Sequence, residues 1–195
     1  MLFVAHRINT IKELQQIPTN FGVEIDLRDS SERLILQHDP FSNGELFEDW
    51  LAYYKHAFLI LNIKSEGIEW KVLELLKLHN ITQYMFLDCS VPMIMKLIKA
   101  GESNIAIRYS EVEPIDLAAR FINKVKWLWV DCFTQFPPFE AEMMNVMSHF
   151  QLCLVSPSLQ NRAINEDDKQ FCSSIQFHAV CEKIYNAKQW LKETF

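Results

Sequence analysis

Three short segments near the N-terminus carry side chains that could act together on a phosphate ester. They are Ala5-His6-Arg7, Glu24-Ile25-Asp26 and His38-Asp39-Pro40. The two histidines can exchange protons near neutral pH, and the arginine can hold an anionic oxygen. The alternate carboxylates can hold a hard cation. Each segment lies at or next to the end of a strand-like run, so the pattern predicts metal-assisted attack on a phosphate ester.

The elements that must position these segments alternate between short β-rich runs and longer helical patterns. Glu24 and Asp26 lie two residues apart in one strand-like run, so both side chains face the same side of a sheet. The runs that predict strands are 2–6, 22–27, 57–63, 84–87, 104–108, 126–130, 151–155 and 177–181, with 33–37 as a hairpin partner of 22–27. The patterns that predict helices are 45–55, 66–79, 90–100, 112–123, 138–149 and 183–193.

Eight strands alternating with helices predict the α/β class and, within it, a small (β/α)8 TIM barrel. The chain of 195 residues is short for this fold, so we expect short or missing helices around 8–17 and after 156. An open doubly wound sheet is the alternative architecture. The absence of repeats and linkers favours a single domain over residues 1–195.

In a parallel barrel the functional side chains gather where strands end. Asn62 and Lys64 end the third strand, where Asn62 could complete an oxygen site for Mg²⁺ or Ca²⁺ with Glu24 and Asp26. Such a cation would relieve the repulsion between two carboxylates inside a barrel. We therefore expect a divalent-metal site here.

The remaining charged groups suit the other steps of phosphodiester cleavage. Arg7 and Lys64 would hold the phosphate charge, while His6 and His38 would divide the work of general base and general acid. Arg108 ends the fifth strand and could bind a polar head group of the substrate, although Asp131 could equally be its partner.

The pattern AHR…VEID…HDP…NIK resembles the glycerophosphodiester phosphodiesterase family. That family belongs to a superfamily that also contains phosphatidylinositol-specific phospholipase C. The resemblance implies a TIM barrel, a metal-dependent two-histidine mechanism and a place in lipid metabolism. It assigns the catalytic pair to His6 and His38, metal ligands to Glu24 and Asp26, and phosphate contacts to Arg7 and Lys64.

The sequence also departs from the pattern of that family. Ile8 stands where a glycine usually follows His-Arg, and no Glu-Asn-Thr segment is found after Ile8. Asn62 stands where a metal-binding glutamate is usual, and the insertion after His-Asp-Pro is nearly absent. The chain therefore resembles a divergent, compact member.

Composition narrows the partners. A net charge of −6 argues against nucleic-acid binding, and four glycines without a phosphate-loop motif argue against nucleotide folds. The five cysteines have no CxxC spacing, which favours reduced thiols. No signal peptide or membrane-length apolar run is evident, so we expect a cytoplasmic protein with a small phosphodiester substrate. The oligomeric state is left open.

Two alternatives to hydrolysis use the same residues. A neighbouring hydroxyl of the substrate could attack the phosphorus, which would make the protein a cyclising phosphodiester lyase. The protein could also be a barrel that binds a phosphate or polyol without turnover, and the neutral Asn62 favours that reading.

Overall fold

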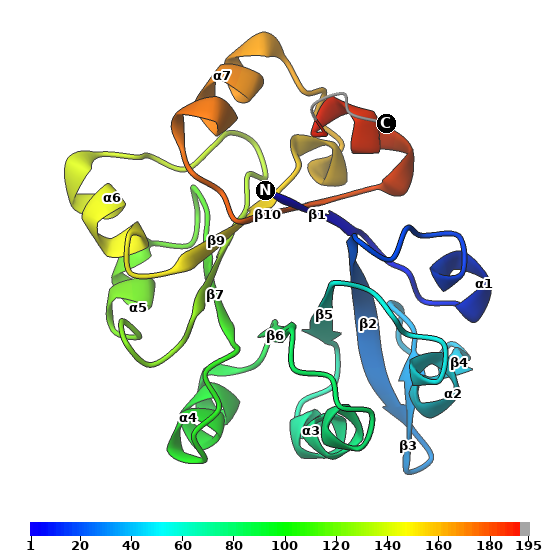
Figure 1. Ribbon diagram of the computed structural model, residues 1–195. Coiled ribbons are helices and arrows are strands. Elements are labelled where there is room, and N and C mark those ends of the chain that lie inside the picture. The colour runs from blue at the N-terminus through cyan, green and yellow to red at the C-terminus, as the bar shows by residue number, and fades with distance from the viewer. Residues whose placement is uncertain (192–195) are drawn as a thin grey trace. The chain divides into compact units, whose positions relative to one another are not determined.

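The computed structural model describes residues 1–191, which form ten strands connected mainly by helices (Figure 1). These residues fall into two compact units, which are described separately. The N-terminal unit is Ala5–Ala100, and the C-terminal unit combines Met1–Val4 with the chain from Gly101 onward. The expectation of a single domain over 1–195 stays a prediction.

The N-terminal unit is built around a five-stranded sheet in the order β4-β3-β2-β5-β6. The neighbours β2, β5 and β6 run parallel, whereas β3 pairs antiparallel with β2 and β4 pairs antiparallel with β3. The bounds are β2 Gly22–Ser30, β3 Arg33–Leu36, β4 Glu45–Leu46, β5 Phe58–Ile63 and β6 Tyr84–Leu87.

Four helices belong to this unit, and α3 and α4 lie along one side of β5 and β6 (Figure 1). Their bounds are α1 Ile11–Leu14, α2 Phe47–Leu51, α3 Glu69–Leu78 and α4 Val91–Lys99. The start of α4 is fixed by Ser90, whose hydroxyl accepts a hydrogen bond from the Met93 amide, and by Pro92 in the first turn. Trp50 and Phe47 of α2 are wholly buried, so even this short helix is held by its packing.

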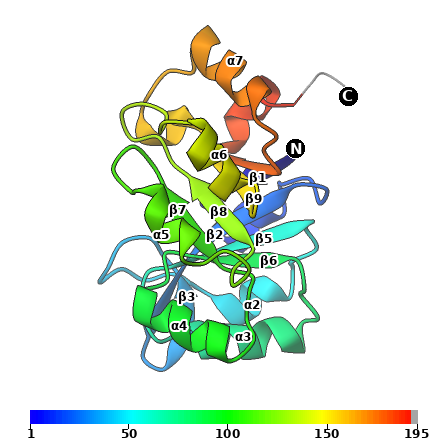
Figure 2. The same cartoon turned by 90° about the vertical axis from the view of Figure 1, so that its left-hand side faces the viewer.

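The C-terminal unit contains β10, β9, β8 and β7 as parallel neighbours in that order, with β1 beside β10. The helix α5 lies against β7 and beside α6 (Figure 2). The strands are β1 Leu2–Ala5, β7 Ala106–Tyr109, β8 Trp127–Val130, β9 Gln151–Val155 and β10 Ala179–Glu182. The helices are α5 Ile115–Ala119, α6 Ala141–Met147 and α7 Glu166–Ser174, with 3₁₀ turns η1 Pro157–Gln160 and η2 Ile184–Gln189.

Every strand that the sequence predicts is confirmed, including the hairpin partner β3, with ends that differ by at most a few residues. The short helix expected around 8–17 is also confirmed, since α1 has four residues. Other helices differ. The segment 45–55 begins with β4, and 112–123 yields only five helical residues. The prediction of an α-helix over 183–193 is wrong over Ile184–Gln189, which form a 3₁₀ turn, while residues 192 and 193 lie outside the described chain.

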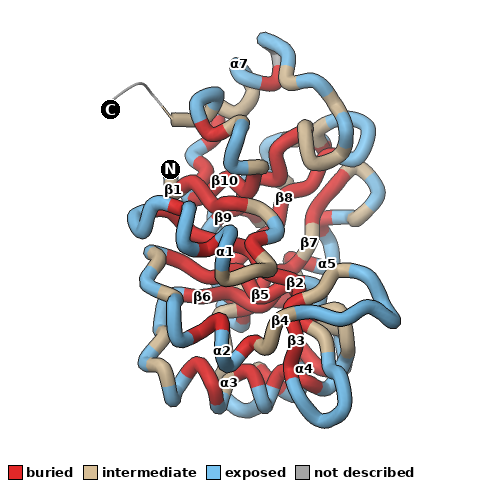
Figure 3. The backbone as a smooth tube through the Cα atoms, turned by 90° about the vertical axis from the view of Figure 1, so that its right-hand side faces the viewer, coloured by how far each residue is buried: buried red, intermediate tan, exposed pale blue. Residues whose placement is uncertain are grey.

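The core of the N-terminal unit is the parallel part of its sheet. All six residues of β5 are buried, and Leu59, Ile60 and Leu61 have no exposed surface, as Figure 3 shows for this strand. Such continuous burial is typical of parallel strands that are covered on both faces. No helix among residues 1–191 is long and apolar enough to cross a membrane.

Candidate active site

The buried sheet of the N-terminal unit contains three polar side chains that carry the predicted site. Glu24 and Asp26 on β2 are 1% and 0% exposed, and Asn62 on β5 is 8% exposed. Asn62 lies opposite Asp26 in the parallel register, and its side-chain amide donates to Glu24 Oε1 at 3.0 Å. Burying two carboxylates that lie two residues apart on one strand costs free energy unless positive charge or hydrogen-bond donors compensate them.

The segment that follows β1 supplies part of this compensation. The backbone N–H of Arg7 donates to Glu24 Oε2 at 2.7 Å, and His6 Nε2 lies 3.8 Å from the same oxygen. The Arg7 side chain adds its charge, with Nε 3.7 Å from Asp26 Oδ2. The predicted meeting of these two segments is therefore observed.

The turn after His6 is built without a glycine. Arg7 itself takes the left-handed conformation, with a φ of 55°, and the next amide, that of Ile8, donates to the backbone oxygen of Glu24 at 2.8 Å. A non-glycine residue in this region is strained and persists only where the surroundings hold it. Two hydrogen bonds to Glu24 hold Arg7 in this conformation. The strained residue is also the predicted phosphate ligand.

Asn9 is a site residue that the sequence reasoning missed. Its side-chain amide donates to Asp26 Oδ2 at 2.9 Å, and its side-chain oxygen accepts from the Asp26 amide at 2.9 Å. A signal was present, because Thr10 and Glu13 form the Thr-x-x-Glu capping box that begins α1. Reading that box would have placed Asn9 at the end of a short loop, beside the strand ends.

Lys64 connects the carboxylates of β2 with the end of β6. Its Nζ lies 3.6 Å from Asp26 Oδ1 and 3.5 Å from Asp88 Oδ2, and its side chain is 18% exposed. Asp88 also has a positive φ, 61°. Lys64 thus lies between two acidic groups, Asp26 and Asp88.

His38 is positioned by neighbours on the β2–β3 hairpin. Its Nδ1 lies 2.8 Å from Asp39 Oδ1, and its backbone oxygen accepts from Arg28. The hydrogen bond to His38, together with the charges of His38, Arg7 and Arg28, lowers the pKa of Asp39 below its usual value. The charge of Arg7 contributes to this lowering, so Arg7, in the turn after His6, interacts electrostatically with Asp39.

The pKa of Glu24 is raised from 4.5 to about 7, chiefly by burial and then by the charge of Asp26. Hydrogen bonds from Asn62 and the Arg7 amide, and the charge of Lys64, oppose this rise without cancelling it. A positive charge placed near this carboxyl group would stabilise its ionised form.

We expect this raised pKa to make the metal-free protein less stable as the pH rises. Between the unfolded value of 4.5 and the folded value of about 7, the folded chain keeps a proton that the unfolded chain has lost. The contribution of Glu24 is therefore most favourable below pH 4.5 and is lost as the pH rises to about 7, by up to roughly 3 kcal/mol. Urea unfolding in excess chelator should show this loss in the wild type and a smaller loss in Glu24→Gln. If the free energy of unfolding falls equally with pH in the two proteins, the raised pKa does not belong to Glu24.

The donor set fits a hard cation. Asp26 Oδ1 and Asn62 Oδ1 are buried and accept no hydrogen bond among the described residues. With Glu24 they offer oxygen ligands of the kind that Mg²⁺ and Ca²⁺ prefer. Among the described side chains, no group of three or more His, Cys, Asp or Glu is arranged to hold a metal ion.

Arg108 lies in the C-terminal unit and is paired with two carboxylates. Its Nε donates to Glu113 Oε1 and its Nη2 to Asp131 Oδ2, both at 2.7 Å. The suggestion that Asp131 is the partner of Arg108 is therefore confirmed. Its predicted contact with substrate stays a prediction.

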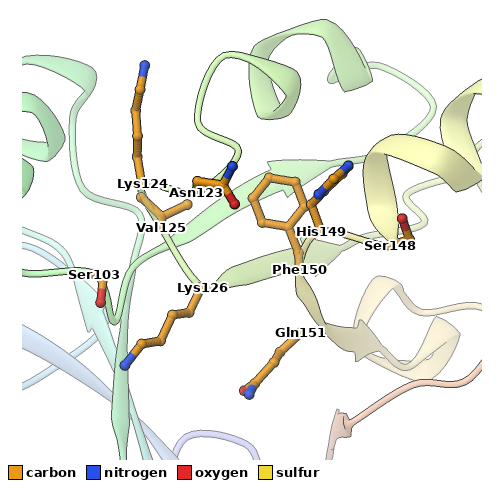
Figure 4. Close-up of a pocket in the computed structure, with 9 residues that line it drawn as sticks. All are labelled: Ser103, Asn123, Lys124, Val125, Lys126, Ser148, His149, Phe150 and Gln151. Carbon is orange, nitrogen blue, oxygen red and sulfur yellow. The ribbon is translucent and has the colours of Figure 1, made fainter.

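A pocket of about 500 Å³ lies at the start of β8 and β9 in the C-terminal unit (Figure 4). Its two lysines extend in opposite directions in Figure 4. Lys124 Nζ donates to the backbone oxygen of Arg120 at 2.8 Å, and Lys126 Nζ donates to Asn104 Oδ1 at 2.9 Å. Their charges do not converge on one ligand, and the pocket lies at the end of these parallel strands where function is not expected.

Comparison with known proteins bears on the fold. A crystal structure of glycerophosphodiester phosphodiesterase from Agrobacterium tumefaciens matches with a TM-score of 0.62 at 12% identity, over 94% of this chain and 95% of that one. A putative glycerophosphodiester phosphodiesterase from Galdieria sulphuraria matches with a TM-score of 0.67 at 14% identity, over 93% of each chain. No protein-family model and no curated protein matches the sequence. The shared fold confirms the predicted α/β barrel class, and it confirms the predicted resemblance to glycerophosphodiester phosphodiesterases at the level of the fold.

Proposed function

We propose that this protein is a divalent-cation-assisted phosphodiester hydrolase that acts on small glycerophosphodiesters. The observation that carries the proposal is the buried pair Glu24 and Asp26, contacted at once by His6, Arg7 and Lys64. This set combines a proton-exchanging group and two cations around a buried anionic centre. The two structures with the same fold, both titled as glycerophosphodiester phosphodiesterases, support the choice of substrate.

The cations of the site would bind the substrate phosphate. Arg7 can offer its fork of N–H donors to two phosphate oxygens, while Lys64 acts as a point charge. Their separations of 3.7 and 3.6 Å from Asp26 are longer than direct hydrogen bonds, so each can turn toward a phosphate oxygen with little loss. Asn9 keeps Asp26 in place through its two hydrogen bonds.

The two histidines would move the protons of the reaction. One takes a proton from the attacking water as its oxygen bonds to phosphorus, and the other gives a proton to the departing alcohol oxygen as the second bond breaks. Asp39, bonded to His38 Nδ1, fixes the ring and leaves Nε2 as the atom that exchanges the proton. The products are a phosphomonoester and an alcohol.

A divalent cation would be held by Glu24, Asp26 and Asn62. When bound, it supplies charge that polarises a phosphoryl oxygen. The raised pKa of Glu24 and the two buried oxygens without hydrogen-bond donors support this location. We expect the neutral Asn62 to make the affinity modest compared with an all-carboxylate site.

A second candidate is a barrel that binds a phosphorylated polyol without turnover. The hydrogen bond from Asn62 to Glu24 and the approach of Lys64 to Asp26 favour it, because the carboxylates are then partly neutralised by the protein itself.

Phosphorus NMR of a reaction with glycerophosphocholine and glycerophosphoinositol tests these candidates together. Hydrolysis should give linear phosphomonoesters that appear only with added Mg²⁺, Ca²⁺ or Mn²⁺. A cyclic phosphate would identify the lyase. Saturable binding of glycerol phosphate without any product would favour the binding barrel and contradict hydrolysis.

A further inference from the structure

Arg28 is the next side chain after Glu24 and Asp26 on the same face of β2, and the proposed chemistry gives it no role. It is half-buried, and its guanidinium donates three hydrogen bonds to backbone oxygens. Nε and Nη2 donate to the oxygen of His38 at 3.1 and 2.7 Å, and Nη1 donates to the oxygen of Lys64 at 3.1 Å. One side chain therefore connects the predicted proton-transfer residue with the predicted phosphate ligand.

Both carbonyls lie where regular strand pairing stops. The pairing of β5 with β2 ends at Leu27 and Ile63, one residue before Lys64, and β3 ends two residues before His38. A carbonyl beyond the end of a strand needs a donor from elsewhere. Arg28 provides that donor on both sides of β2, so it fixes the directions in which the two loops leave the sheet.

The chemistry of the guanidinium explains why an arginine is needed. Its donors form a rigid planar fork that can reach two separate carbonyls at fixed angles, whereas a lysine presents one compact ammonium. Within the described part of the chain Arg28 forms no ion pair with a carboxylate; its hydrogen bonds go to carbonyls, and its charge contributes to the lowered pKa of Asp39. Removing the guanidinium from water costs free energy, and its hydrogen bonds hold the two carbonyls in a precise geometry.

We propose that Arg28 is a positioning residue, which holds the loops of His38 and Lys64 in register for action on one phosphodiester. The inference rests on the proposed function for its consequence in catalysis. Its geometric part, that Arg28 orders both loops, stands without it. A misplacement of catalytic groups by about 1 Å can lower a rate about 100-fold, so we expect kcat to depend on this fork.

A pocket of about 400 Å³ beside Arg28 offers a direct test by chemical rescue. Its lining includes Pro40 and Phe41, which follow the His38 segment, and Ser65, which follows Lys64. In Arg28→Ala the space left by the side chain would open into this pocket. Free guanidinium at low, non-denaturing concentration should enter it and restore part of the lost turnover.

The experiment compares Arg28→Met, Arg28→Lys and Arg28→Ala with the matched control Arg33→Met. Arg33 lies on the adjacent strand, and its side chain is 55% exposed and lies 4.0 Å from Glu48. Turnover of bis(p-nitrophenyl) phosphate, urea unfolding, and NMR of the His38 ring and the Ser65 amide are measured for each protein. We expect the Arg28 variants to lose about 10- to 100-fold in kcat, to shift or broaden both NMR signals, and to gain activity from guanidinium only in the Ala variant. Arg33→Met should match the wild type.

Two outcomes would overturn the inference. The first is an unchanged His38 ring signal and Ser65 amide in all folded Arg28 variants. The second is a lowered unfolding midpoint with kcat intact in the folded molecules, because that is a purely structural role. If the wild type cleaves no phosphodiester, the proposed function fails, and the NMR comparison still decides whether Arg28 orders the two loops.

Discussion

Replacing either His6 or His38 with alanine is expected to lower kcat for a phosphodiester by about 10²- to 10⁴-fold, the usual range for loss of a general acid or base. Neither change should unfold the protein. The His6 side chain is 20% exposed and the His38 side chain 37% exposed, so truncation opens no sealed cavity in the core. Steady-state kinetics and urea unfolding of each variant provide the measurement.

The matched control for this prediction is His149→Ala, since His149 is an exposed histidine of the C-terminal unit. It should keep wild-type kinetics. The double variant of His6 and His38 should lose little more than the worse single variant, because residues that act in one proton-transfer sequence are not additive. Full activity in either single variant would contradict the two-histidine mechanism.

The pH profile should separate the two histidines. Asp39, like any exposed aspartate, is ionised at neutral pH, and its hydrogen bond to His38 lowers its pKa further. In Asp39→Asn the ring of His38 loses its negative neighbour, and the imidazolium becomes less stable. The limb of the kcat/KM profile that reports His38 should therefore move to lower pH, while the limb that reports His6 stays in place. A profile that does not move would mean that His38 does not exchange a proton in the reaction.

The sequence predicted the part of the site that lies on strands. Glu24 and Asp26 alternate in an apolar run, and alternation within a strand determines the face to which a side chain points. Their positions, and that of Asn62 opposite Asp26, follow from parallel pairing of adjacent βα units. Local periodicity was enough for these residues because regular hydrogen bonding between paired strands sets the position of every residue along them.

The loops were harder to predict because their geometry depends on contacts between distant segments. Asn9 bonds Asp26 across 17 residues of chain, and Arg28 bonds Lys64 across 36. No periodic pattern encodes such pairs. Ile8 stands where the family pattern has a glycine, and Arg7 adopts the left-handed conformation, since Glu24 supplies acceptors for two successive amides. Helix length was similarly misjudged where packing, and not capping, decides it.

Removing divalent cations should reduce turnover to near the uncatalysed level, and returning Mg²⁺, Ca²⁺ or Mn²⁺ should restore it. The physical reason is the buried pair Glu24 and Asp26: burial, and then the charge of Asp26, raise the pKa of Glu24 to about 7 in the absence of a metal. A bound cation stabilises the folded state, and the stabilisation grows with the logarithm of its concentration relative to Kd. Calorimetric titration and urea unfolding with each metal should both detect it, which gives readouts independent of activity.

Asn62 allows the cation site to be tested by a gain of binding. Asn62→Glu adds a third carboxylate beside Glu24, so the metal-free variant should be less stable than the wild type and its affinity for Ca²⁺ or Mg²⁺ should rise at least tenfold. Asn62→Gln is the matched control, because it has the length of glutamate and no charge. If cations stabilise the Glu variant more than the Gln variant, the site lies at Glu24, Asp26 and residue 62. If they stabilise neither, Lys64 already neutralises Asp26 well enough to exclude a metal, and the binding barrel becomes the better account of the function.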